Sequence, residues 1–172
     1  MTLDGFCDHT AGIPDEEIHH HYANLLNNAG VVLYGRITYQ LMQFWQTLLK
    51  NPSGEKSMDD FAMAIDKVPK IVFSNTLEST EWDSAKLSNQ PIEEQVLELK
   101  KQSGKDIWLC GGSELATTLF PEIDELILKV NPILLGWGIP LFSGAVQETD
   151  LTLSDNKSYS NGFMLLRYRV NH

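Results

Sequence analysis

The sequence has few cysteines, a shortage of basic residues and no long apolar run. Its only cysteines, Cys7 and Cys110, lie far apart, which excludes a disulfide framework and favours free thiols in the cytoplasm. Thirteen basic against 23 acidic residues give a formal net charge of −10, so neither nucleic acid nor an anionic membrane is an expected partner. No apolar run approaches the roughly 18 residues of a membrane span, and no signal peptide is visible. We therefore expect one cytoplasmic domain over residues 1–172 that acts on a small molecule.

The sequence also lacks histidines at the spacing that a metal site on a helix requires. His19, His20 and His21 are consecutive, and neighbouring residues of a helix point about 100° apart, so the three cannot share a face. None of them has a histidine partner four residues away. No metal site is predicted, and we interpret the three histidines as a solvated helix face and Cys110 as a buried core thiol.

Short apolar runs alternate with helical patterns up to about residue 124. A first helix is expected to open at Ile13-Pro14-Asp15-Glu16-Glu17, with Asp15 as its cap. Further helices are expected from Arg36 to Leu49, over 58–66, after Pro91 and over 113–120. Strands are expected at 31–34, 69–74 and 106–110, with a short one at 82–87. This alternation favours parallel strands with helices on both faces of the sheet.

The pattern changes after Asp124. Apolar or alternating runs at 126–135, 151–154 and 162–170 follow one another without a helical pattern between them. Such runs predict antiparallel strands that close one edge of the sheet. The expected fold class is an α/β domain with a mixed sheet.

Two of the expected strands end in glycine directly before a helix. Gly111-Gly112 precedes the helix that starts at Ser113, and Gly35 precedes Arg36. Glycine lets the backbone approach a ligand, and the first N–H groups of a helix favour an anion. The Arg36 guanidinium suits a phosphate. An anion site is predicted at both turns, and the alternative for each is a plain tight turn. Ser74, which ends the strand at 69–74, fits a contact with an anion and a simple turn-forming role equally well.

A second glycine pair has a different interpretation. Gly136-Trp137-Gly138 imitates the start of a dinucleotide-binding fingerprint, but Pro140 follows and the next pattern is that of a strand. We interpret this segment as a turn between strands.

Taken in order, the pieces of this chain resemble the dihydrofolate-reductase-like superfamily. The closer resemblance is to the branch related to the C-terminal reductase domain of the bifunctional riboflavin deaminase-reductase. The segments that carry it are Leu3–Phe6, Leu33–Tyr39 followed by Trp45, Lys70–Leu77, Leu109–Leu115, Ile123–Leu126 and Pro132–Phe142. The resemblance implies a three-layer α/β/α domain with a mixed, mainly parallel sheet of eight strands, an antiparallel C-terminal edge and assembly as a homodimer.

The resemblance also implies NADPH as the cofactor, bound across the strand ends. Arg36 would face the 2′-phosphate, and Ser74 would contact the adenosine phosphate. The complete set of implied cofactor residues is Gly35, Arg36, Thr38, Ser74, Gly111, Gly112, Ser113, Glu114 and Leu115. In the superfamily a cis bond often joins the glycine pair.

The sequence departs from the superfamily at two places. Only Met1, Thr2 and Leu3 precede the Asp4-Gly5 turn, so the first strand is expected to be shortened unless upstream residues complete it. Folate reductases carry an acid on the first helix, and the nearest position here is close to His19. Folate reduction is therefore not the expected activity.

Three functions remain open from the sequence. The first is an NADPH-dependent reductase of a small unsaturated heterocycle, pterin-like or pyrimidine-like, in which the cofactor carries the hydride chemistry. The second is a nucleotide-binding protein of the same fold with little or no catalysis, and the third is the 5-amino-6-(5-phosphoribosylamino)uracil reductase of riboflavin biosynthesis. No proton donor is assigned; Asp4, Asp15 and Glu16 are the candidates, and Asp4 and Trp45 are candidates for contact with the substrate.

Overall fold

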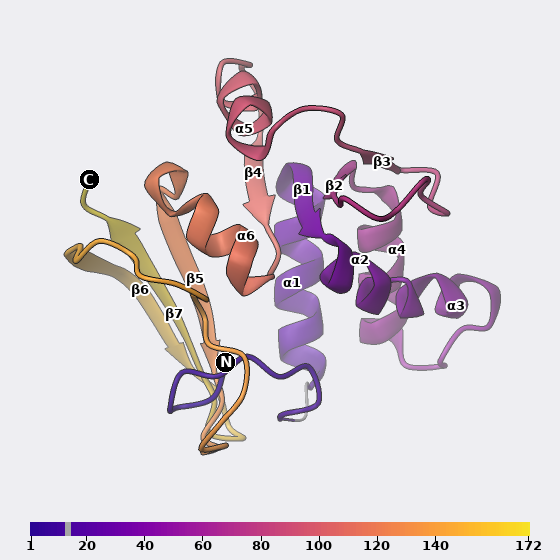
Figure 1. Cartoon of the computed structure of the whole chain (residues 1–172). Coiled ribbons are helices and arrows are strands. Elements are labelled where there is room, and N and C mark those ends of the chain that lie inside the picture. Colours follow the sequence, from indigo (N-terminus) through magenta and orange to yellow (C-terminus); the bar gives the residue numbers. More distant parts are fainter. Residues whose placement is uncertain (13–14) are drawn as a thin grey trace. The chain divides into compact units, whose positions relative to one another are not determined.

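The computed structural model describes residues 1–12 and 15–172, which form two compact units (Figure 1). We call residues 15–112 the parallel unit, and residues 1–12 with 113–172 the antiparallel unit. Ile13 and Pro14, where the sequence predicts the opening of the first helix, lie outside the described residues. No helix within the described ranges is long and apolar enough to cross a membrane.

The parallel unit contains a four-stranded sheet in the order β3-β2-β1-β4, in which every neighbouring pair is parallel. The strands are β1 (Ala29–Gly35), β2 (Lys70–Phe73), β3 (Ala85–Leu87) and β4 (Asp106–Leu109). They confirm the strands predicted from the apolar runs. β1 is central, and its residues 31–34 and all four residues of β2 are buried, as expected for strands covered on both faces.

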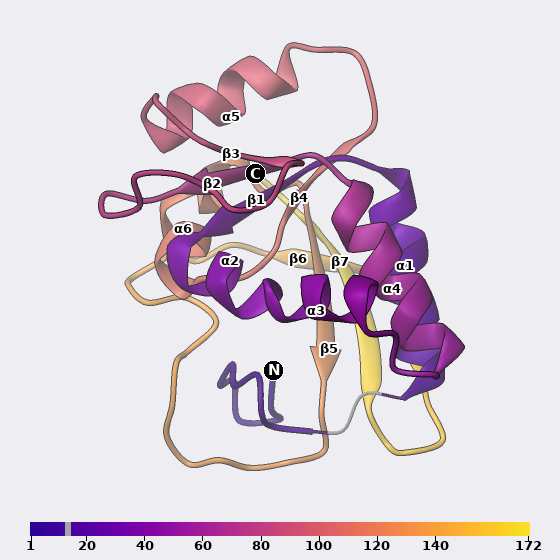
Figure 2. The same ribbon diagram turned by 90° about the vertical axis from the view of Figure 1, so that its right-hand side faces the viewer.

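Helices cover both faces of this sheet and make the parallel unit a three-layer structure. α1 (Glu16–Asn28) and α4 (Lys56–Lys67) lie on one face, and α5 (Ile92–Lys100) lies on the other (Figure 2). Asp15 caps α1 as predicted, because its side chain accepts the N–H of Ile18 at 3.1 Å. The core forms where Val32, Tyr34 and Val72 of the sheet meet Phe61 and Ile65 of α4.

The helix predicted from Arg36 to Leu49 is two helices, α2 (Arg36–Met42) and α3 (Phe44–Lys50). Its predicted apolar face is only partly buried, because Leu41 and Leu49 are 42% and 39% exposed. Trp45 instead packs edge-on against Phe61, with ring centroids 4.5 Å apart. The aromatic contact with α4, rather than a continuous helical stripe, fixes this segment.

The histidine segment also differs from its prediction as a solvated face. His19 is buried, with its ring centroid 5.8 Å from that of Trp45 and 6.0 Å from that of Phe61. His20 is exposed. The packing of α1 against α4 decides the difference, since it covers the side of α1 that carries His19.

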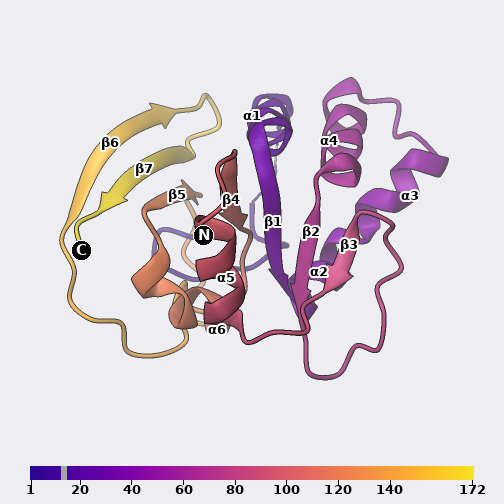
Figure 3. The same cartoon turned by 90° about the horizontal axis from the view of Figure 1, so that it is seen from above.

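The antiparallel unit contains a three-stranded sheet in the order β5-β7-β6 (Figure 3). Its strands are β5 (Glu125–Val130), β6 (Leu151–Ser158) and β7 (Met164–Val170), and both pairs are antiparallel, as predicted. The helix predicted over 113–120 is shorter: α6 (Ser113–Thr118) is followed by a 3₁₀ turn at Phe120–Glu122. Pro121 lies in that turn; it has no backbone N–H to donate, and its ring would clash with the carbonyl four residues earlier, so it cannot continue α6.

The resemblance implies one mixed sheet, whereas the described residues form two separate sheets. The α/β class and the antiparallel C-terminal strands are confirmed, but the residues before Asp4 form no strand. Thr2 makes a single parallel bridge to Asn131, and the Met1 ammonium donates to the Lys129 carbonyl at 2.7 Å. Within the described residues, the N-terminal segment therefore adds two isolated bridges, at Thr2 and at Phe6, to the antiparallel unit rather than a strand.

Candidate functional site

The carboxyl ends of three neighbouring strands of the parallel unit meet at one edge of the sheet. β1 lies between β4 and β2 (Figure 3), with Leu33 opposite Leu109 and Gly35 opposite Phe73. From β1 the chain runs outward through β2 and β3, and β4 then pairs with the opposite side of β1. The strand order thus reverses between β1 and β4. Ligands of open α/β sheets bind in the crevice outside such a switch point, which places Gly35 and Gly111 at the expected edge.

Thr38, on the helix that follows Gly35, lies beside Gly111 of the other glycine turn. A Cβ atom built on Gly111 would lie 3.5 Å from Thr38 Oγ1 and 3.6 Å from Thr38 Cγ2. The turn after β1 and the turn after β4 are therefore neighbours, as the resemblance implies. Gly35 has open space at the Cβ position, with nothing within 4 Å.

Gly111 and Gly112 both have positive φ angles, 70° and 88°, and both are exposed. A side chain at either position would strain the backbone, so glycine is required by conformation as well as by access. The cis bond that often joins the pair in the superfamily is not found here, since the described residues contain no cis peptide. The exposed, trans glycine backbone offers its peptide groups to a ligand.

Arg36 and Ser74 supply side-chain donors at the same edge. The partly exposed Arg36 guanidinium donates to Gln40 Oε1 at 3.1 Å, one turn along α2. Ser74 follows β2 directly, and its Oγ accepts the N–H groups of Thr76 at 3.1 Å and Leu77 at 3.0 Å. Ser74 thus shapes its turn, and its hydroxyl also lies 3.5 Å from Thr76 Oγ1, a contact in which either hydroxyl can donate.

The remaining predicted cofactor residues belong to the antiparallel unit. Ser113, Glu114 and Leu115 open α6, and Leu115 is buried while Glu114 is exposed. α6 has six residues and α2 has seven, so neither helix has the length on which a strong terminal dipole depends. The turn glycines and the Arg36 and Ser74 side chains are the stronger features of this edge.

Asp4 lies in the antiparallel unit, where its carboxylate holds a loop. It accepts the Thr2 hydroxyl at 2.6 Å, the Gly136 N–H at 2.7 Å and the Leu135 N–H at 3.0 Å. The Thr2 hydroxyl, followed by the backbone N–H groups, lowers the pKa of the Asp4 carboxyl. An ionised carboxylate occupied in this way has no proton to donate at neutral pH.

The other candidates for chemistry occupy varied places. The Asp15 carboxylate caps α1, Glu16 is exposed on the first turn of that helix, and Trp45 packs between His19 and Phe61. Gly136 and Gly138 lie in the loop between β5 and β6, in agreement with their interpretation as a turn, and Trp137 between them is 83% exposed.

A buried tyrosine, Tyr34, and a partly buried thiol, Cys110, directly precede the two glycine turns, and the sequence pattern predicts no site role for either. Tyr34 of β1 is 0% exposed and lies beside Cys110, the residue that directly follows β4. Burial raises the pKa of the Tyr34 phenol well above its ordinary value and raises the pKa of the Cys110 thiol to about 12. Cys110 is therefore a protonated thiol and no nucleophile, but it is only partly buried and packs against the core, whereas the sequence predicts a fully buried one. Position directly before a turn glycine was the available signal for both.

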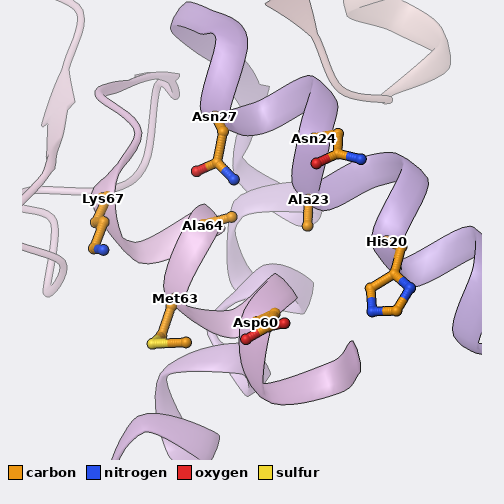
Figure 4. A pocket seen from close by; sticks show the side chains of 8 residues that line it. All are labelled: His20, Ala23, Asn24, Asn27, Asp60, Met63, Ala64 and Lys67. Carbon is orange, nitrogen blue, oxygen red and sulfur yellow. The ribbon is translucent and has the colours of Figure 1, made fainter. Parts of the chain in front are cut away.

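A groove also lies between α1 and α4 (Figure 4). His20, Asn24 and Asn27 of α1 face Asp60 and Lys67 of α4 across it. None of the residues that the sequence predicts for cofactor or substrate lies in this groove. The strand-end edge, rather than the groove, is the candidate site.

The comparisons with known proteins identify the family. The sequence profile of the RibD C-terminal domain matches residues 1–165. The chain belongs to this family. It is also 33% identical to the uncharacterized protein YyaP of Bacillus subtilis (strain 168), over 99% of this chain and 92% of YyaP.

Solved structures of RibD-like proteins share the fold. A putative riboflavin biosynthesis protein from Shewanella sp. PV-4 superimposes with a TM-score of 0.67 at 16% identity, over 99% of this chain and 95% of that one. A pyrimidine reductase-like protein from Corynebacterium diphtheriae gives a TM-score of 0.66 at 16% identity, over 99% and 89%. The bifunctional deaminase and 5-amino-6-(5-phosphoribosylamino)uracil reductase of Thermotoga maritima gives 0.64 at 18% identity, and this chain spans 54% of its length. These similarities confirm the dihydrofolate-reductase-like fold.

Proposed function

We propose that this protein is an NADPH-dependent reductase of a small unsaturated heterocycle, of the pyrimidine or pterin kind. The observation that carries the proposal is the edge where β1, β2 and β4 end. There, the partly exposed Gly35 and the exposed Gly111 and Gly112 lie at the reversal of strand order, and Thr38 of α2 lies beside Gly111. Membership of the RibD C-terminal domain family supports a reductase, and the C. diphtheriae and T. maritima proteins support a pyrimidine-like substrate.

The residues at this edge fit a dinucleotide phosphate. Gly35 has open space around its Cβ position, and Gly111 and Gly112 have exposed backbone, so a pyrophosphate can approach the main chain. Arg36 and Ser74 are the donors that would hold the adenosine end, with Thr38 beside Gly111. Bound NADPH supplies a hydride, and the protein contributes binding, orientation and the exclusion of water.

A titration followed by nicotinamide fluorescence tests this proposal. We expect NADPH to bind more tightly than NADH, and Arg36→Ala to weaken NADPH about tenfold or more because it removes a charged hydrogen bond. NADH should hardly respond, and Arg169→Ala, which removes an exposed arginine of β7, serves as the matched charge control. No binding of either nucleotide at millimolar concentration would overturn the proposal. Equal losses for both would remove Arg36 from the 2′-phosphate.

A nucleotide-binding protein without catalysis is the second candidate. It is favoured because two of the candidate proton donors already make structural hydrogen bonds: Asp4 holds a loop and Asp15 caps a helix. NADPH oxidation, measured with dihydropterins and with 5-amino-6-(5-phosphoribosylamino)uracil as substrates, distinguishes the reductase from the non-catalytic nucleotide-binding protein. Oxidation dependent on the uracil compound supports the riboflavin-pathway reductase, whereas tight NADPH binding without turnover of any heterocycle supports the binder.

A further inference from the structure

Tyr39 is the only buried residue of α2, the helix that carries Arg36 and Thr38. Its side chain is 2% exposed, whereas Ile37 and Leu41 on the same helix are 58% and 42% exposed. The attachment of this short helix to the parallel unit therefore depends strongly on one tyrosine. Any displacement of that tyrosine would move Arg36, three residues earlier.

The Tyr39 side chain contacts the loop between β2 and β3. Its hydroxyl oxygen accepts the backbone N–H of Glu81 at 3.0 Å, and its ring centroid lies 6.4 Å from that of Trp82. The same loop begins at Ser74, the other side-chain donor at the strand ends. One loop thus connects the two donors through Tyr39.

A charged cluster fixes the Trp82 end of this loop. The indole N–H of Trp82 donates to Asp66 Oδ1 at 2.6 Å, and the Lys70 ammonium lies 4.1 Å from the Trp82 ring centroid. Lys70 is 1% exposed and donates to the Val68 carbonyl at 2.8 Å and to Ser84 Oγ at 2.6 Å. Trp82 is therefore held by α4 and by β2 together, which gives Tyr39 a rigid surface to rest on.

We propose that Tyr39 is a positioning residue of the cofactor site, and that the Trp82, Asp66 and Lys70 cluster is its support. The Tyr39 hydroxyl fixes the orientation of α2 and with it the direction of the Arg36 guanidinium. Recognition of the 2′-phosphate is the property that depends on this orientation, because a bidentate guanidinium requires a defined angle. The inference rests on the proposed function for its ligand, but the orientation of α2 is a property of the protein alone.

Hydrogen exchange of the nucleotide-free protein tests the positioning role directly. Tyr39→Phe keeps the ring and removes only the acceptor of the Glu81 N–H, so we expect the amides of α2 and of Glu81 to exchange about threefold to tenfold faster. The amides of α1 should not change. Glu81→Ala retains the backbone N–H and is the matched control, with no change expected in α2. Unaltered exchange in α2 of Tyr39→Phe would overturn the proposal, whatever the nucleotide result.

The nucleotide arm separates positioning from general stability. Tyr39→Phe should weaken NADPH about threefold to tenfold and NADH by less than about twofold, whereas a merely structural loss would weaken both alike. Trp82→Phe, which removes the N–H donor to Asp66, should lower the preference for NADPH in the same direction. If wild type binds neither nucleotide, the proposed function fails while the exchange result still decides the role of Tyr39. Faster exchange with an unchanged NADPH preference would overturn the link to Arg36.

Discussion

All four residues of β2 are buried, whereas all eight residues of β6 are exposed. β2 is an apolar strand of the parallel unit with helices on both faces of its sheet, and β6 is a largely polar edge strand of the antiparallel unit. Parallel strands covered on both faces resist displacement because any shift opens a packed core, whereas an exposed edge strand makes few packing contacts that a shift would break. The comparison suggests why glycine turns at the ends of β1 and β4 suit a site that needs fixed geometry.

The difference extends to the polar groups of the two units. In the parallel unit, the Lys70 ammonium is enclosed by carbonyls, a serine and a tryptophan ring. In the antiparallel unit, the Asp4 carboxylate is bound by N–H groups at the surface. Because Lys70 is buried, its protonation should affect the stability of the folded protein. Because Asp4 is exposed, its loss should affect only the loop that it binds, so substitutions in the two units should have different effects.

Truncating a core side chain should have the largest effect. Phe61→Ala removes the ring that packs on Trp45 and His19, and we expect a loss of about 3–5 kcal/mol in the free energy of unfolding. Leu153→Ala on β6, where the side chain is 48% exposed, should cost no more than about 0.5 kcal/mol. Urea denaturation followed by tryptophan fluorescence and by circular dichroism measures both. Similar losses would break the comparison between the units.

The buried ammonium of Lys70 should make stability rise with pH. Burial lowers the pKa of Lys70 from 10.5 to about 8, against a smaller opposing effect of Asp66. Between about pH 8 and 10.5 the unfolded chain therefore binds more protons than the folded one, so the free energy of unfolding increases with pH, by up to about 3 kcal/mol.

The Lys70→Met variant isolates this contribution. Other groups titrate in the same window, but they are common to both proteins, and their contribution cancels in the difference between wild type and variant. The difference should change in favour of wild type as the pH rises from 8 to 10.5, measured by urea denaturation at a series of pH values. A flat difference would show that the folded protein holds Lys70 without perturbing its pKa.

A side chain at Gly111 should weaken NADPH binding because of where Gly111 lies, and not only because of backbone strain. Gly111 and Gly54 both have positive φ, 70° and 83°, and valine strains either by about 1–3 kcal/mol. Only Gly111 lies beside Thr38, since nothing lies within 4 Å of the Cβ position at Gly54. We expect Gly111→Val to weaken NADPH at least about tenfold and Gly54→Val to leave it unchanged. Equal NADPH affinities in fluorescence titrations of the two variants would place the nucleotide elsewhere.

The smallest expected effect is confined to one loop. Asp4→Ala removes the acceptor of the Leu135 and Gly136 N–H groups, so these two amides should exchange faster while β1 and β2 remain protected. Asp8→Ala is the matched control, because the Asp8 carboxylate accepts the N–H and the hydroxyl of Thr10 in its own turn. The lowered pKa of Asp4 means that protection of the loop is present above pH 3.8 and is lost as the pH falls below it. Exchange that spreads into the parallel unit would contradict a local role.

Local sequence determined the elements and the residues at their ends. The apolar runs at 31–34 and 70–73 became buried strands, Asp15 became a cap, and Gly35 and Gly111 stand at strand ends. Periodicity, capping and φ preference act over a few residues, so they can be read before the fold is known. Family membership extends the same reasoning to the order of the pieces.

The tertiary structure decided which of these pieces meet. The Tyr39 hydroxyl binds an N–H 42 residues away, the Asp4 carboxylate binds N–H groups 131 and 132 residues away, and His19 is buried because α1 packs on α4. No local pattern specifies such partners, because they depend on how the strands pair and which helix faces are covered. For the same reason the sequence could predict antiparallel C-terminal strands but not that they form a sheet of their own. The sheets are separate because, within the described residues, no ladder of backbone hydrogen bonds joins β4 to the strands of the antiparallel unit. The segment around Thr2 forms isolated bridges and not a strand.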